Sequence, residues 1–121
     1  AIASTVAHDS HNLVVVGDSE RDVLLAINEI KRIGGGLALV YDGKVLGSMP
    51  LDIAGIMSSE KLEVIAKKQD ELTQAAYETL HISRDVSPFM TLAFMALTVI
   101  PELKITDKGL FDVKKFELTC V

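Results

Sequence analysis

The chain has 121 residues, which fits one domain and is too short for two. With 49% hydrophobic and 24% charged residues, the composition is that of a globular protein, and it excludes disordered and low-complexity classes. Twelve basic residues against seventeen acidic ones give a net charge of −5, so the sequence lacks the basic surface of a nucleic-acid-binding protein.

One cysteine and the absence of a long apolar segment limit the setting of the chain. Cys120 alone cannot form an internal disulfide or a CxxC motif, which favours a reducing, cytoplasmic location. The longest uncharged apolar stretch, residues 88–101, is too short to span a bilayer and is expected to be a buried core element. No signal peptide is visible, and the missing initiator Met suggests a chain cut from something longer. We therefore expect neither nucleic acid nor a membrane as a partner.

The N-terminal part is predicted to form two extended segments. Residues 2–7 are expected to be extended, and the four apolar residues 13–16 are expected to form a buried strand. Residues 8–11 between them are typical of a four-residue hairpin loop.

A helix is predicted to follow, capped by Asp18 or Ser19. Its apolar residues recur at helical spacing and predict the buried face: Val23, Leu24, Ile27, Ile30 and Ile33. Gly34 stands where a left-handed C-cap belongs.

The glycine run 34–36 indicates a helix end and close backbone packing. A phosphate-binding glycine loop follows a strand and opens a helix, whereas these glycines close a helix and precede the apolar residues 37–41. Asp42-Gly43 then predicts a tight hairpin between residues 37–41 and residues 44–49.

A second helix is expected to be capped by Ser58 or Ser59, with Glu63 and Lys67 as an i,i+4 ion pair on its outer side. Its predicted apolar face consists of Leu62, Ile65, Ala66, Leu72, Ala76 and Leu80.

The C-terminal part is predicted to hold a short helix and late strands. Residues 89–97 suit a strand in length, but their Met, Leu and Ala content favours a short helix that starts at Pro88 after a Ser87 cap. Residues 103–106 and 116–121 are predicted to be strands. The fold class is therefore α/β (α+β): a single domain with a mixed, mostly antiparallel sheet, β-hairpins and two to three helices packed on it.

The segment His8-Asp9-Ser10-His11-Asn12 is the only place where several groups able to do acid–base chemistry or bind metal occur together. Imidazole exchanges a proton near neutral pH and binds divalent metals through a neutral nitrogen. Asp9 is placed to orient one of the two rings by accepting its N–H. A shared site requires a turn, because His8 and His11 would point to opposite faces of a straight strand.

A structural interpretation of the same segment stays open. The side chains of Asp, Ser and Asn often form hydrogen bonds with their own backbone in loops, and the histidines would then have no functional role. A metal site complete within this chain is not expected, since only two or three ligands are in view.

His81 follows the second helix and is placed to interact with its negative pole. The four methionines, Met49, Met57, Met90 and Met95, are expected to fill core or interface space.

Segments spread over nearly the whole chain resemble, in order, the C-terminal domain of bacterial and archaeal adenine deaminases. The resemblance begins at residues 3–17, ASTVAHDSHNLVVVG, and continues through residues 33–36 and 42–46. The later matching segments are LDIAGIMS at 51–58, PFMTL at 88–92 and VIPELKITDKGL at 99–110.

The resemblance implies that the chain is the C-terminal part of a purine-salvage hydrolase. In that family a preceding amidohydrolase-type barrel carries a divalent metal, manganese or iron, and converts adenine and water to hypoxanthine and ammonia. The barrel would hold most of the metal ligands, so the isolated chain is expected to bind no cofactor and to be inactive. The expected partners are this barrel in the same chain, adenine as substrate, and further copies in a homo-oligomer.

The domain is expected to contribute to the active site of the enzyme, and two alternatives stay open. His8, Asp9 and His11 are candidate catalytic residues in a pocket between the domains, and Ser10 and Asn12 are candidate substrate-binding residues. The alternatives are a non-catalytic docking or oligomerisation module and a stand-alone small-molecule-binding regulatory domain. The missing Met argues against the stand-alone domain.

Overall fold

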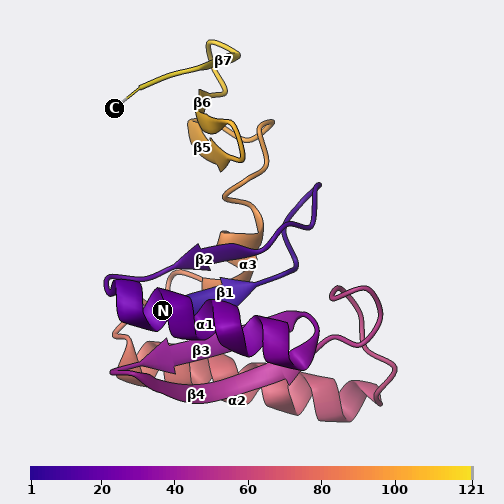
Figure 1. Ribbon diagram of the computed structural model, residues 1–121. Coiled ribbons are helices and arrows are strands. Elements are labelled where there is room, and N and C mark those ends of the chain that lie inside the picture. The colour runs from indigo at the N-terminus through magenta and orange to yellow at the C-terminus, as the bar shows by residue number, and fades with distance from the viewer. Residues whose placement is uncertain (121) are drawn as a thin grey trace.

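The N-terminal half of the chain forms a four-stranded antiparallel sheet in the order β2-β1-β3-β4 (Figure 1). Its strands are β1 (Ile2–Ser4), β2 (Val14–Val16), β3 (Gly36–Tyr41) and β4 (Lys44–Pro50). The computed structural model describes residues 1–120. Asp42 and Gly43, both at positive φ, close the β3–β4 hairpin as its tight turn requires.

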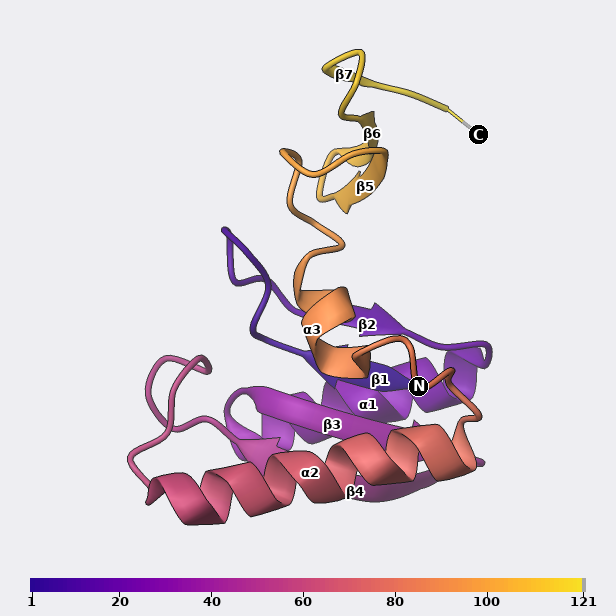
Figure 2. The ribbon, with the colours of Figure 1, turned by 180° about the vertical axis from the view of Figure 1, so that it is seen from behind.

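Helices cover both faces of this sheet (Figures 1 and 2). Helix α1 (Glu20–Ile33) packs on one face, where Ala26 and Ile30 meet the buried strand residues Ala38 and Val40. Helices α2 (Leu62–Thr79) and α3 (Pro88–Ala93) lie on the other face. The larger apolar cluster on that face consists of Ile2, Leu37, Leu39, Met49, Leu51, Leu72, Ala76, Phe89 and Leu92.

A second, smaller antiparallel sheet stands apart from this body, beyond α3 (Figures 1 and 2). It comprises β5 (Leu103–Thr106), β6 (Gly109–Asp112) and β7 (Glu117–Leu118). The backbone N–H of Ile105 donates to the carbonyl of Met95 at 3.1 Å and ties this sheet to the segment after α3. The α+β class with hairpins and three helices is confirmed, and the strands are divided between two sheets.

The predicted ends of α1 and the start of α3 are confirmed. The Ser19 side chain accepts a hydrogen bond from the Asp22 N–H, and Gly34 adopts the left-handed conformation at φ 78°. Helix α3 begins at Pro88 after Ser87. On α1, however, Leu24 is 61% exposed, so its predicted place on the buried face is wrong.

The buried strand predicted at residues 13–16 is an edge strand. Strand β2 has a partner on one side only, and Val16 is 54% exposed. The predicted four-residue hairpin loop is wrong as well, because β1 ends at Ser4 and β2 begins at Val14. A run of apolar β-branched residues predicts a strand but not its place in the sheet, since edge and central strands share that composition.

The predicted cap of α2 is wrong. The helix begins at Leu62 after Lys61, because the N–H and the hydroxyl of Ser59 both donate to the carboxylate of Asp52 instead. Of the predicted apolar face, Leu72 and Ala76 are buried, whereas Leu62 is 77% exposed.

Three smaller expectations also change. Ala66 is exposed, and Lys67 pairs with Glu71 at 3.9 Å rather than with Glu63. The stretch 88–101 is buried only in its α3 part, since Val99 is 69% exposed. The strand predicted at 116–121 is reduced to the two residues of β7, and residue 121 lies outside the described residues. No helix among the described residues is long and apolar enough to cross a membrane.

Candidate functional site

The long connection between β1 and β2 carries the polar segment 8–12 and is fixed to the sheet and to α3 by backbone hydrogen bonds. The N–H of Thr5 donates to Gly36 O, and the N–H of His8 donates to Ala93 O at 2.8 Å. The N–H of His11 donates a hydrogen bond to Ala7 O at 2.6 Å, and His11 has a φ of 50°, so the chain forms a turn here. The connection therefore presents its side chains in a defined arrangement at the end of α3.

This turn brings the two imidazole rings of the segment into contact. The rings of His8 and His11 meet edge to face with 5.6 Å between their centroids. The other neighbour of His8 is Phe94, whose ring stacks on it at 4.8 Å with an interplanar angle of 21°. His8 is half-buried, whereas His11 is exposed. The stack and the edge contact restrict the orientation of the His8 ring.

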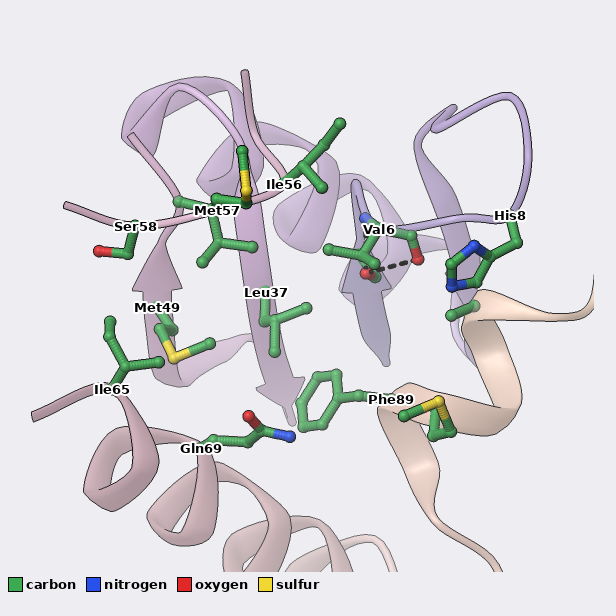
Figure 3. Close-up of a pocket in the computed structure, with 14 residues that line it drawn as sticks. Val6, His8, Leu37, Met49, Ile56, Met57, Ser58, Ile65, Gln69 and Phe89 are labelled. Carbon is green, nitrogen blue, oxygen red and sulfur yellow. Dashed lines mark hydrogen bonds between the residues drawn. The ribbon is translucent and has the colours of Figure 1, made fainter. Parts of the chain in front are cut away.

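His8 also lines a cavity of about 380 Å³ between the sheet, α2 and α3, which we call the His8 pocket (Figure 3). A volume of this size falls in the range of small-molecule sites. The pocket is lined by Ser4, Val6, His8, Leu37, Met49, Leu51, Ile56, Met57, Ser58, Ile65, Gln69, Phe89, Met90 and Ala93.

Three segments that are distant in sequence meet at the His8 pocket. Alternate residues of the first segment (Ser4, Val6 and His8) line it together with residues 56–58 and 89–90. Each of these sets belongs to a segment that carries the family resemblance described above. The fold thus gathers these segments at one place, which makes the pocket the candidate functional site.

The loop from 51 to 59 that forms one wall of the pocket is held by an acidic side chain. The hydroxyl of Ser59 and then its backbone N–H, at 2.9 Å, lower the pKa of Asp52 to about 2. Close backbone packing fixes the same wall to the sheet. A Cβ on Gly35 would lie 2.7 Å from the Cα of Gly55, so these glycines permit a contact that a side chain would block.

The remaining residues of the polar segment face a different space. Asp9, Ser10 and Asn12 line a second cleft with β2, residues 95–98 and residues 105–107. The structure therefore places His8 and His11 together, but it separates the candidate substrate-binding residues Ser10 and Asn12 from the His8 pocket.

The described residues do not supply a complete metal site. Among residues 1–120, no group of three or more His, Cys, Asp or Glu side chains is placed to hold a metal ion. His81, the third histidine, follows α2 and lines another cavity with Asp18 and Tyr41. The donor set of this chain, two adjacent imidazoles on one loop, does not fit a divalent cation by itself.

Sequence reasoning missed two residues: Phe94, whose ring stacks on that of His8, and Gln69, which lines the His8 pocket. Gln69 lies in a run of polar residues on α2, where nothing in the sequence distinguishes it from a solvated side chain. The methionines were predicted to fill core or interface space. Met49 lies in the core, and Met57 and Met90 are more than half exposed at the pocket.

Comparisons of the sequence with a family model and with curated proteins all find adenine deaminases. Residues 1–117 match the family described as the adenine deaminase C-terminal domain. The chain is 53% identical over its full length to the adenine deaminase of Nitratidesulfovibrio vulgaris strain DP4, covering 21% of that protein. It is 55% identical over its full length to adenine deaminase 2 of Carboxydothermus hydrogenoformans, again covering 21%. With the adenine deaminase of Clostridium acetobutylicum it shares 50% identity over 97% of the chain and 20% of the relative. The chain thus spans about a fifth of the length of the curated relatives it matches.

Proposed function

The chain belongs to the adenine deaminase C-terminal domain family, and we propose that it is the C-terminal domain of an enzyme that hydrolyses adenine to hypoxanthine and ammonia. The match over residues 1–117 is the observation that carries this proposal. The enzyme would serve purine salvage in the cytoplasm. The chain covers only about a fifth of this curated relative, and our proposal places an amidohydrolase-type barrel before this domain in the longer enzyme.

We place the divalent metal, manganese or iron, in that barrel. The two adjacent imidazoles of this chain do not make a ligand set, so no step of the reaction is derived through the metal from residues 1–120. The part of the chemistry that this domain supplies is proton transfer and enclosure of the substrate.

The domain is proposed to pack with its His8 pocket toward the barrel. Met57 and Met90 are 58% and 56% exposed at this pocket, and flexible thioether side chains on a surface suit an interface. Packing of the barrel on this face would cover them and would exclude water from the pocket, which strengthens polar interactions inside it.

His8 is the candidate catalytic residue of the domain. During hydrolysis a water oxygen adds to the ring carbon that carries the amino group, and the C–N bond then breaks, so the departing nitrogen needs a proton. Imidazole is suited to deliver it near neutral pH. Phe94 and His11 hold the ring in place as positioning residues. Asp9, Ser10 and Asn12 line the second cleft, so our proposal assigns substrate contact to the His8 pocket alone.

The test uses the full-length enzyme that contains this chain, loaded with manganese and assayed for ammonia release from adenine. His8→Asn should lower kcat by about a hundredfold or more, the size of a general acid–base contribution. His81→Asn is the matched control and should stay within twofold, since Asn is well suited to the left-handed backbone of His81 at φ 53°.

Two results of this assay contradict the proposal at different levels. An unchanged rate in folded His8→Asn would remove His8 from the reaction and make the domain a scaffold. A wild-type enzyme that releases no ammonia from adenine would refute the proposed activity itself.

A second candidate function, a docking or oligomerisation module, is favoured by the β5–β7 sheet. This sheet stands apart from the body and exposes Ile105, Phe116 and Leu118 by 54–76%. Contact between copies would bury these side chains. Light scattering of the full-length enzyme, with and without Ile105→Lys and Phe116→Lys, tests this candidate: dissociation in the double variant supports it, and an unchanged mass contradicts it.

A further inference from the structure

We propose that the His8 pocket is a purine subsite of this domain, in which Gln69 recognises the amino edge of adenine. The proposal rests on the proposed function, because it takes adenine from it, but it assigns a ligand and a specificity-determining residue to a cavity within this chain. Three properties of the pocket carry it: its size, its apolar walls and the positions of two of its polar side chains, Gln69 and His8.

The walls suit a flat heteroaromatic ring. Leu37, Met49 and Phe89 are each buried, and they line one continuous apolar surface with the exposed side chains of Met57 and Met90. Aromatic and thioether groups contact the faces of π-systems favourably. A cavity of about 380 Å³ lies at the small end of the range of ligand pockets, and a bicyclic base fits into it.

The polar groups are few and lie on two sides of this apolar surface. In Figure 3 the carboxamide of Gln69 points from α2 toward Phe89, and the His8 ring lies on the other side of Phe89. Ser4 is already engaged, since its hydroxyl donates to Val6 O. Ser58 also lines the pocket, and its hydroxyl accepts a hydrogen bond from the N–H of Glu60 at 3.2 Å. We therefore assign the hydrogen bonds to the edge of a bound ring to His8 and to the exposed side chain of Gln69.

A glutamine carboxamide matches adenine better than hypoxanthine. Its NH₂ donates to N7 of adenine and its carbonyl accepts from the 6-amino group, which gives two hydrogen bonds. In hypoxanthine the 6-position is a carbonyl oxygen, so both edge atoms are acceptors and one of the two bonds is lost. The pocket is thus expected to favour the substrate over the product of the deamination, which assists product release.

The first experiment titrates adenine, and separately hypoxanthine, into the 121-residue chain and follows amide shifts by NMR. Saturable shifts confined to residues of the His8 pocket, with adenine bound at least about fivefold more tightly than hypoxanthine, are expected from a bidentate contact. Shifts that lie elsewhere, the absence of saturable shifts, or equal affinities for the two bases would overturn the proposal.

The second experiment compares Gln69→Leu with Gln74→Leu in the full-length enzyme. Both glutamines lie on α2, but Gln74 accepts a hydrogen bond from Arg84 at 3.4 Å and does not line the pocket. Gln69→Leu should raise the KM for adenine at least about fivefold with kcat within twofold, and Gln74→Leu should change neither. An unchanged KM in Gln69→Leu overturns the subsite, whereas loss of adenine hydrolysis in the unmodified enzyme overturns the proposed function instead.

Discussion

The carboxylate of Glu29 joins α1 to β4, and its replacement tests the electrostatic part of the fold. Glu29 is buried on α1. Its carboxylate accepts a hydrogen bond from the hydroxyl of Ser48 on β4 and two hydrogen bonds, each of 2.7 Å, from N–H groups of Arg32. The hydrogen bonds from Arg32, followed by that from Ser48, lower the pKa of Glu29 from 4.5 to about 2. At face value this drop corresponds to about 3.4 kcal/mol. Because Arg32 is 67% exposed and water screens its charge, we expect about 1–2 kcal/mol.

Glu29→Gln keeps the size of the side chain and removes its charge, so it should lower the free energy of unfolding by about 1–2 kcal/mol at pH 7. The pKa of Glu29 is lower in the folded state than in the unfolded state. The stabilisation is therefore complete above the unfolded value of 4.5 and is lost as the pH falls toward about 2. At pH 3 the difference between the two proteins should be less than about half of its value at pH 7.

Urea unfolding followed by circular dichroism at 222 nm measures both differences. Glu78→Gln is the control, because Glu78 is an exposed carboxylate on α2, and its replacement should change the free energy of unfolding by less than about 0.5 kcal/mol. The reasoning is refuted if Glu29→Gln costs no more than Glu78→Gln, or if its cost is the same at pH 3 and pH 7.

Two further predictions concern residues close in sequence to the walls of the His8 pocket. Gly36→Ala should lower the free energy of unfolding by about 3 kcal/mol or more, because φ is 137° and the new Cβ would lie 2.0 Å from the carbonyl oxygen of Met49. Gly34→Ala, at φ 78° in open space, should cost only about 1 kcal/mol, and equal losses in urea unfolding would contradict the contact. Asp52 should titrate with a pKa of about 2 in a carboxyl ¹³C NMR titration, and Ser59→Ala should raise that pKa toward 3.8. A midpoint near 3.8 in the unchanged protein would show that Ser59 does not hold the loop.

The local structure was predictable where short-range chemistry decides it. Ser19 and Gly34 delimit α1 because capping depends on a few neighbouring residues, and Asp42-Gly43 determines its hairpin for the same reason. The cap of α2 was not predictable in this way. Ser59 bonds Asp52, seven residues earlier, and this tertiary interaction removes it from the helix.

Longer-range arrangement was the weaker part of the prediction. The edge position of β2 and the division of the strands between two sheets depend on which strands pair, and β-propensity does not specify pairing. Leu24 has helical spacing with the core residues, yet the sheet covers a narrower stripe of α1 than the spacing suggests.

The candidate site was predictable in part. The sequence singled out His8 and His11, and the structure brings their rings together. It did not single out Phe94 or Gln69, because a phenylalanine in an apolar run and a glutamine in a polar helix carry no distinguishing pattern. Only the fold shows that side chains of the segments 4–8, 56–58 and 89–90, among them Val6, Met57 and Phe89, share one cavity.

We propose above all that the His8 pocket faces the adenine site of a larger enzyme. A structure of the full-length enzyme with adenine, or a non-reactive analogue of it, bound at the metal-containing site tests this claim most directly. We predict that side chains of the His8 pocket lie within contact distance of the bound base, about 4 Å, with Met57 and Met90 covered by the preceding domain. A His8 pocket that opens to bulk solvent on a face remote from the bound base would contradict the account.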